Sequence, residues 1–222
     1  MKFFVLVPIL LLMGVPLFAD STTELAPGAA GQLRELLNKP ALIRPTEAVP
    51  LGKNWFRLET DAHVFTDEVT VAQVAAVLLD LENQSKFYNG QKSKLTVNIV
   101  SAGADESIAD FVSISVGPLN IQIKTPYRAS VKAVEHTDTK IAVEVRQLPQ
   151  DSSSNNDIKN LFATRYAEEV VLNGRRYTYI RIYTIDEVNA SILPGAKKTL
   201  ENSSEPVNLE ALQLIITAAK TK

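Results

Sequence analysis

The feature that most constrains this chain is one amphipathic helix predicted over residues 70–81, with the sequence TVAQVAAVLLDL. Thr70 followed three residues later by Gln73 is a capping-box arrangement, in which each side chain accepts a hydrogen bond from the other residue's backbone N–H. The apolar residues recur at spacings of three and four, so they form one stripe: Val71, Val74, Ala75, Leu78 and Leu81. The stripe must cover an apolar surface. We therefore expect Val74 and Leu78 to be buried against strand residues such as Ile121 and Val143.

Strand-like stretches surround this helix, and their side chains alternate with the period of two that is typical of half-buried strands. One stretch, 55–64, precedes the helix, and the others follow it: 95–99, 108–116, 119–133, 141–145, 162–172 and 175–185. Asn173-Gly174 joins the last two and is the strongest short signal for a hairpin turn. A closing helix is predicted over 208–219, NLEALQLIITAA, with Asn208 as its N-cap. This order predicts an α+β fold with a long antiparallel meander.

Pro126 interrupts the longest strand-like run, 119–133. Proline has no N–H to donate to a neighbouring strand, so the chain at this point bends, carries a bulge or lies at a sheet edge. A straight strand of about 16 residues would also be about 50 Å long, which is too long for this domain.

The N-terminus has the pattern of a secretory signal peptide. Lys2 is followed by an apolar run that ends at Phe18, and Ala19 is a small residue suited to the position before a cleavage site. The alternative is a membrane anchor, but the run is short of the ~20 residues that a helix needs to span a bilayer, and it contains two prolines. We therefore predict a signal peptide over 1–19 and no stable membrane span after its cleavage.

The composition and the positions of the prolines indicate the expected domain organisation. Prolines at 40, 45 and 50 favour an N-terminal arm or linker over 20–54, followed by a single domain over 55–222. Loss of Lys2 with the signal changes the formal net charge from −2 to −3, and this mildly acidic balance argues against nucleic-acid binding. The chain has no cysteine, which fits a bacterial periplasm better than a small disulfide-stapled extracellular scaffold. We expect an exported protein, periplasmic or extracellular.

The element order resembles the helix-grip fold of the START-like (SRPBCC) superfamily, which includes lipid-transfer domains, pollen-allergen proteins and polyketide cyclases. Three segments carry the resemblance: TVAQVAAVLLDLENQSKFY from Thr70, the hairpin at Asn173-Gly174, and the closing helix over 208–219. It implies a curved antiparallel sheet of about seven strands, with one helix after the first strand and a C-terminal helix. Sheet and last helix would enclose an apolar cavity. No active-site motif of the family matches this chain.

Candidate ligand-binding residues come from strand parity and from aromatic content. Asp110 shares its face with Val112 and Ile114, and Glu168 shares its face with Tyr166. Arg181 is a potential ion-pair partner, although Ile180 and Ile182 argue that the opposite face of its strand is buried. Six aromatic residues could line a pocket or could be ordinary cross-strand packing: Tyr127, Phe162, Tyr166, Tyr177, Tyr179 and Tyr183. The resulting set is Asp110, Val112, Ile114, Tyr127, Phe162, Tyr166, Glu168 and Arg181. A bulge or register slip would instead place the charged members outside.

No other chemistry is indicated by the sequence. His63 and His136, the only histidines, are too far apart in sequence to predict a metal site, and no nucleophile elbow is present. We expect no cofactor. The favoured hypothesis is a non-catalytic domain that binds an apolar small molecule or lipid in a cavity between sheet and helix. The alternatives are a cyclase- or hydrolase-type enzyme on the same cavity, and a structural or interaction protein with a filled core.

Overall fold

The computed structural model describes residues 23–24, 33, 35–116, 122–149, 158–190 and 195–222. The predicted signal peptide, 1–19, lies outside these residues, as does Ile121. The signal peptide therefore stays a prediction.

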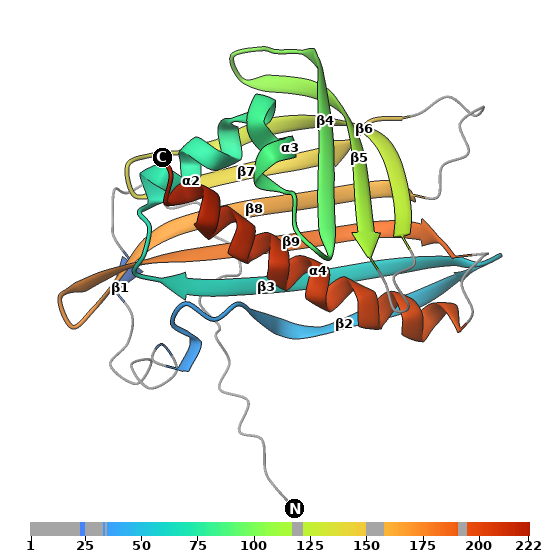
Figure 1. The fold of residues 1–222 in the computed structure, drawn as a ribbon, viewed down its shortest axis with the longest axis horizontal. Coiled ribbons are helices and arrows are strands. Elements are labelled where there is room, and N and C mark those ends of the chain that lie inside the picture. The colour runs from blue at the N-terminus through green and yellow to red at the C-terminus, as the bar shows by residue number, and fades with distance from the viewer. Residues whose placement is uncertain (1–22, 25–32, 34, 117–121, 150–157, 191–194) are drawn as a thin grey trace, which may run out of the picture.

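One large curved sheet forms the body of the protein (Figure 1). Its strand order is β2-β3-β9-β8-β7-β6-β5-β4, and every neighbouring pair along this path is antiparallel. The strands are β2 (Ala41–Gly52), β3 (Trp55–Thr66), β4 (Ser93–Ser101), β5 (Glu106–Val116), β6 (Gln122–His136), β7 (Lys140–Gln147), β8 (Ile158–Leu172) and β9 (Arg175–Asn189). A two-residue strand, β1 (Thr23–Glu24), adds a parallel pairing to β8. The predicted α+β fold with an antiparallel meander is confirmed.

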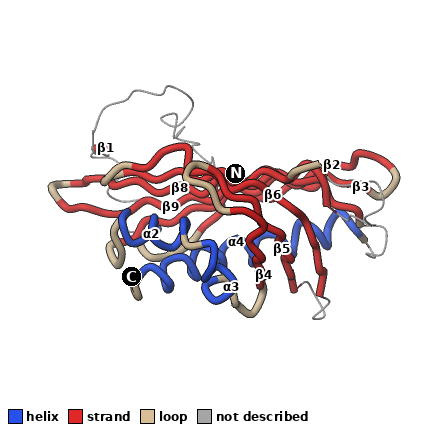
Figure 2. Tube along the Cα trace, turned by 90° about the horizontal axis from the view of Figure 1, so that it is seen from above, coloured by secondary structure: helices blue, strands red, loops and turns tan. Residues whose placement is uncertain are grey.

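The helices lie together on one face of this sheet, as the edge view shows (Figure 2). They are α2 (Val71–Leu79), the short 3₁₀ helix η1 (Leu81–Asn83), α3 (Gln84–Phe87) and α4 (Ala196–Ala219). Helix α2 packs on β7 and β8, and α4 crosses β2 and β3 and also contacts α2 (Figure 1). Among the described residues, no helix combines the length and the apolar character needed to cross a membrane.

Helix α2 forms where the sequence predicts it, although it ends at Leu79, two residues before the predicted end. The Thr70 hydroxyl accepts a hydrogen bond from the Gln73 backbone N–H at 3.3 Å, and the Gln73 side chain accepts one from the Thr70 N–H at 2.9 Å. Val74 is fully buried and Leu78 is 1% exposed, and both belong to the main core cluster together with Val143. The prediction that this stripe covers the sheet is confirmed for Val143.

Helix α4 is twice as long as predicted, because the helix continues on the N-terminal side of Pro206, which lies inside it. Proline removes one backbone hydrogen bond, and side chains bond to nearby carbonyls around the break. Ser204 Oγ donates to the Leu200 carbonyl at 2.8 Å, and Asn208 Nδ2 donates to the Ser204 carbonyl at 2.9 Å. Asn208 is therefore an interior residue of the helix, and the prediction that it is the N-cap is wrong.

The segment from Ala41 to Gly52 is an edge strand of the sheet, although its prolines favour a linker in the sequence. β2 pairs with β3 through three register irregularities, and it carries Pro45 and Pro50. An edge strand tolerates proline because one of its sides has no partner to receive an N–H.

Pro126 in β6 follows the same rule. Pairing of β6 with β7 covers Ala129 to His136 only, so at Pro126 the strand has β5 as its sole paired neighbour in the described sheet. Of the three arrangements considered for this proline, the local edge is the one present. A bulge also occurs in β6, between Ala133 and Glu135, at some distance from the proline.

Candidate functional site

A partly open cavity of about 220 Å³ lies between the sheet and α4. Its floor comes from the inward side chains of β3, β8 and β9, and its sides come from β4 to β7. The roof is the middle of α4, from Leu200 to Ala211, and Tyr88 closes the end toward α3. Leu58, Leu161, Ile182, Val188, Leu200 and Val207 are apolar members of the lining. The cavity is thus the space that the resemblance to the helix-grip fold implies.

The cavity exists because several inward strand positions carry small side chains. On β5 the inward residues at this point are Ser113 and Ser115, and on β8 they include Ala163. The bulkier neighbours Val112, Ile114 and Phe162 alternate with them and point away from the helices. Small side chains on a concave face leave volume that larger ones would fill.

One end of the cavity carries a cation. The Arg165 guanidinium lies 4.9 Å from the centre of the Tyr88 ring and donates a hydrogen bond to Gln84 Oε1 at 3.0 Å. Gln84 is fully buried and donates in turn to the Leu78 carbonyl at 3.1 Å, so α2, α3 and β8 are tied together here. The buried Tyr88 hydroxyl has no hydrogen-bond partner in the described part of the chain, and burial raises the pKa of Tyr88.

The middle of the cavity wall carries Tyr127, whose ring stacks on Phe111 with centroids 5.2 Å apart. Burial raises the pKa of Tyr127 to about 12; the charge of Arg165 lowers it and that of Asp186 raises it. Tyr127 therefore lies within electrostatic reach of both charged residues and stays protonated at neutral pH.

Asp186 supplies a carboxyl group on the β9 side of the cavity. Burial alone raises the pKa of this group from 3.8 to about 7. Its neighbours in the lining include Leu58, its cross-strand partner on β3, and Val188 and Thr184 on β9. A carboxyl group with a pKa near neutrality can hold a proton for a ligand or accept one from it.

A carboxylate on α4 holds this helix in place at the mouth of the cavity. Glu210 accepts hydrogen bonds from the backbone N–H groups of Gln91 at 2.8 Å, Lys92 at 2.8 Å and Ser93 at 2.7 Å. Gly90 leaves the space that this carboxylate fills, because a Cβ at Gly90 would lie 2.4 Å from it. The contact holds α4 against the start of β4.

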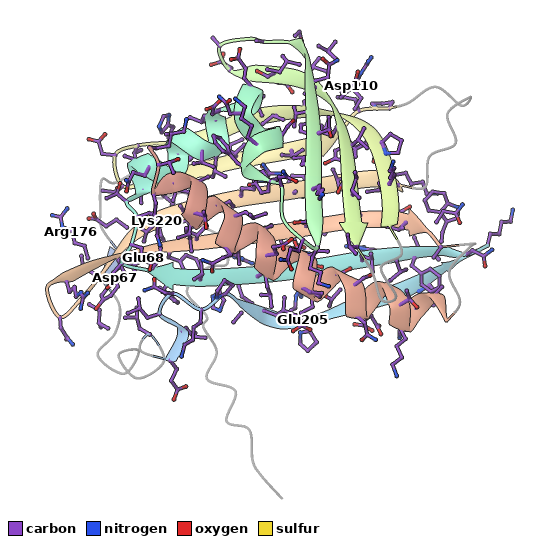
Figure 3. The ribbon with its side chains drawn as sticks, in the orientation of Figure 1. Asp67, Glu68, Asp110, Arg176, Glu205 and Lys220 are labelled. Carbon is purple, nitrogen blue, oxygen red and sulfur yellow. The ribbon has the colours of Figure 1, made fainter. Side chains whose placement is uncertain are left out.

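Only Tyr127 of the predicted ligand-binding set lines the cavity. The other seven residues lie on strand faces that point away from the helices. Among the charged members, Glu168 is nevertheless buried there, at 8% exposure. Asp110, labelled beside the upper part of β5 in Figure 3, forms an ion pair with Arg128 at 2.6 Å, and this hydrogen bond lowers the pKa of Asp110. Val112 and Ile114 share that face and are half-buried.

The remaining predicted residues gather on the opposite face of β8 and β9. Tyr166 is the cross-strand partner of Arg181, and its hydroxyl donates to Glu168 at 2.5 Å. Arg181 donates twice to Asp61, at 2.7 and 2.8 Å, and Phe162 lies under the Arg146 guanidinium at 4.8 Å. The expected inward orientation of these residues is wrong, because Ala163, Arg165 and Ala167 are the inward positions of β8.

Sequence reasoning missed Arg165 and Asp186, two charged residues of the cavity lining. Arg165 has the parity opposite to the aromatic face of β8, and Asp186 lies one residue beyond the predicted end of its strand. The usable signal was the alternation of Ile180, Ile182, Thr184 and Asp186, which continues the inward face past that end. Within the described ranges, no group of three or more His, Cys, Asp or Glu side chains is placed to hold a metal ion.

Comparison with known proteins identifies the architecture. No protein-family model and no curated protein sequence matches the chain. Among solved structures, human StAR-related lipid transfer protein 5 superimposes with a TM-score of 0.53 at 8% identity, over 81% of this chain and 88% of that one. Human STARD10 superimposes with a TM-score of 0.51 at 9% identity, over 79% of this chain and 73% of that one. At such identities the likeness concerns the fold alone, and this chain has the helix-grip fold of START-like proteins.

Proposed function

We propose that this protein binds one apolar small molecule or lipid in the cavity under α4, without catalysis. The observation that carries the proposal is a partly open cavity of about 220 Å³ with apolar residues from both sheet and helix in its wall. Its fold is that of solved lipid-transfer proteins, which supports a ligand-binding use of this space.

The size of the cavity favours a small ligand. Pockets for drug-sized molecules usually measure about 300–1,000 Å³, and the cavity of about 220 Å³ lies below that range. A single alkyl chain or a small ring system fits this volume better than a lipid with two acyl chains.

Two measurements test binding. Native mass spectrometry of protein purified from its own host should reveal a co-purifying small molecule, and an apolar fluorescent dye should bind the emptied protein. Absence of both signals would rule out the binding function.

A pair of substitutions on β8 tests whether the cavity is the site. Ala163→Phe places a ring in the cavity and should abolish dye binding, because Ala163 is in the lining. Thr164→Phe, one residue along and on the other face of the strand, is the matched control and should leave binding unchanged. Circular dichroism would verify that both variants are folded. Equal dye binding by both would place the dye elsewhere.

We also propose that the chain is exported and that cleavage near Ala19 releases it into the periplasm or the extracellular space. The run from Phe3 to Phe18 behind Lys2 supports this proposal. N-terminal sequencing of the mature protein should begin at or near Asp20, and Leu11→Arg, which breaks the apolar run, should leave the N-terminus intact. Recovery of intact Met1 from the wild-type protein would contradict export.

A further inference from the structure

Among the described residues that line the cavity, Asp186 is the only acidic one. Its cross-strand neighbour on β3 is Leu58, and Val188 follows it on the same face of β9. In the part of the chain that the structure describes, no hydrogen bond or ion pair reaches its carboxyl group. A charged group in an apolar wall costs much free energy unless a partner neutralises it.

Arg165 does not neutralise Asp186. The cross-strand partner of Arg165 is Ile182, and Asp186 lies four residues farther along β9, which is roughly 13 Å at about 3.3 Å per residue. The Arg165 guanidinium is also engaged in the other direction, by Gln84 and by the Tyr88 ring. The cavity therefore has, at one end, a cation held by one hydrogen bond and a ring contact, and at the other end an anion without a partner in the described chain.

The other groups that face the cavity do not supply Asp186 with a partner. Lys94 is the third charged residue in the lining, and it is exposed at the mouth, on β4. Residues contributed by α4 and β3 are uncharged, and the tyrosines are Tyr88 and Tyr127. Among the described residues, Asp186 thus lacks a positively charged partner.

We propose that the ligand is an apolar amine, a single chain or small ring whose ammonium group lies against Asp186. This inference rests on the proposed function and specifies the chemical class of the ligand. An ammonium group offers a full charge and up to three hydrogen-bond donors to the carboxylate, whereas an alcohol offers one neutral donor. A ligand carboxylate would meet repulsion at Asp186 and would have to share Arg165 with Gln84 and the Tyr88 ring.

The proposal predicts a characteristic pH dependence. With a pKa of about 7, Asp186 is mostly protonated at pH 6 and mostly ionised at pH 8. An alkylamine, with a pKa near that of lysine at about 10.4, stays protonated throughout this range. Its affinity should therefore rise about tenfold between pH 6 and pH 8, because the ionised fraction of a group with pKa 7 rises by about that factor.

Three probes of equal chain length test the inference: n-octylamine, n-octanol and octanoate, titrated against bound dye in emptied protein. At pH 8, octylamine should bind at least tenfold more tightly than octanol, and octanoate should bind most weakly. In Asp186→Asn the preference for the amine and its pH dependence should both disappear. Asp110→Asn, which removes a surface carboxylate, should keep both.

Each outcome has one reading. Tighter binding of octanoate than of octylamine would overturn the inference and indicate Arg165 as the anchor. Equal binding of all three probes would also overturn it, while the proposed binding function would stand. If neither dye nor any probe binds, the binding function itself fails. Should Asp186→Asn not fold, the pH dependence of octylamine binding to the wild type decides, and a flat profile contradicts the inference.

Discussion

Asp186→Asn should stabilise the ligand-free protein at and above pH 7, because it removes a carboxylate from an apolar wall with little change in shape. Burial raises the pKa of this carboxyl group from 3.8 to about 7. At about 1.36 kcal/mol for each pKa unit, ionisation in the folded state weakens folding by about 4 kcal/mol. Removal of the charge should recover a stabilisation of that order.

Proton linkage fixes the pH range of this effect. A carboxyl group whose pKa is raised by folding binds its proton more tightly in the folded than in the unfolded state. Below about pH 4 it is protonated in both states, so wild type and variant should be equally stable. Between about pH 4 and pH 7 the wild type should lose stability relative to the variant, and above about pH 7 the difference should stay constant.

Urea unfolding followed by circular dichroism at pH 4.5, 6, 7.5 and 8.5 measures this difference on protein freed of ligand. Asp110→Asn is the control, because that carboxylate is stabilised by Arg128 at the surface and its pKa is lowered. Its loss should change stability by at most about 1 kcal/mol and with the opposite sign at neutral pH. A difference below about 0.5 kcal/mol between wild type and Asp186→Asn at every pH would refute the reasoning and mean that water hydrates Asp186.

Two further predictions concern packing and the fastening of α4. Leu78→Ala should cost about 2–5 kcal/mol of unfolding free energy, because Leu78 is 1% exposed, whereas Leu79→Ala next to it, 39% exposed, should stay within about 0.5 kcal/mol. Equal losses in urea melts would mean that α2 does not cover the sheet. Glu210→Ala should cost about 1–3 kcal/mol through its lost hydrogen bonds, and Gly90→Ala should displace the same carboxylate. In a double-mutant cycle the two losses should therefore not add.

Local signals in the sequence were sufficient for the elements that are stabilised locally. The capping box at Thr70 and Gln73 forms as predicted, and Asn173-Gly174 joins β8 to β9 with both residues at positive φ. These features depend on a few neighbouring residues and on the hydrophobic stripe of one helix. The same holds for the inward face of β7, where Ile141 and Val143 fill the core.

The inward faces of β5 and β8, which border the cavity, were misassigned for a physical reason. Where a strand lines empty space, its inward positions are small or polar, as at Ser113 and Ala163, and its bulky residues point outward. Alternation then predicts the wrong face, because the rule assumes that the inward face is filled with apolar side chains. The strand nature of β2 and the length of α4 were missed for another reason: proline at an edge or near bonding side chains is tolerated in the folded protein.

The pairing of β3 with β9 sets the order in which the cavity can close. Asp61 on β3 and Arg181 on β9 are 120 residues apart in sequence, whereas β4 to β9 pair with their neighbours along the chain. The β2–β3 hairpin can therefore join the sheet only after β9 has formed, and such distant pairings are slow steps in folding. Because the contacts of α4 with the sheet are mainly to β2 and β3, the helix lacks most of its support from the sheet before that step. Closure of the cavity is thus coupled to the completion of folding.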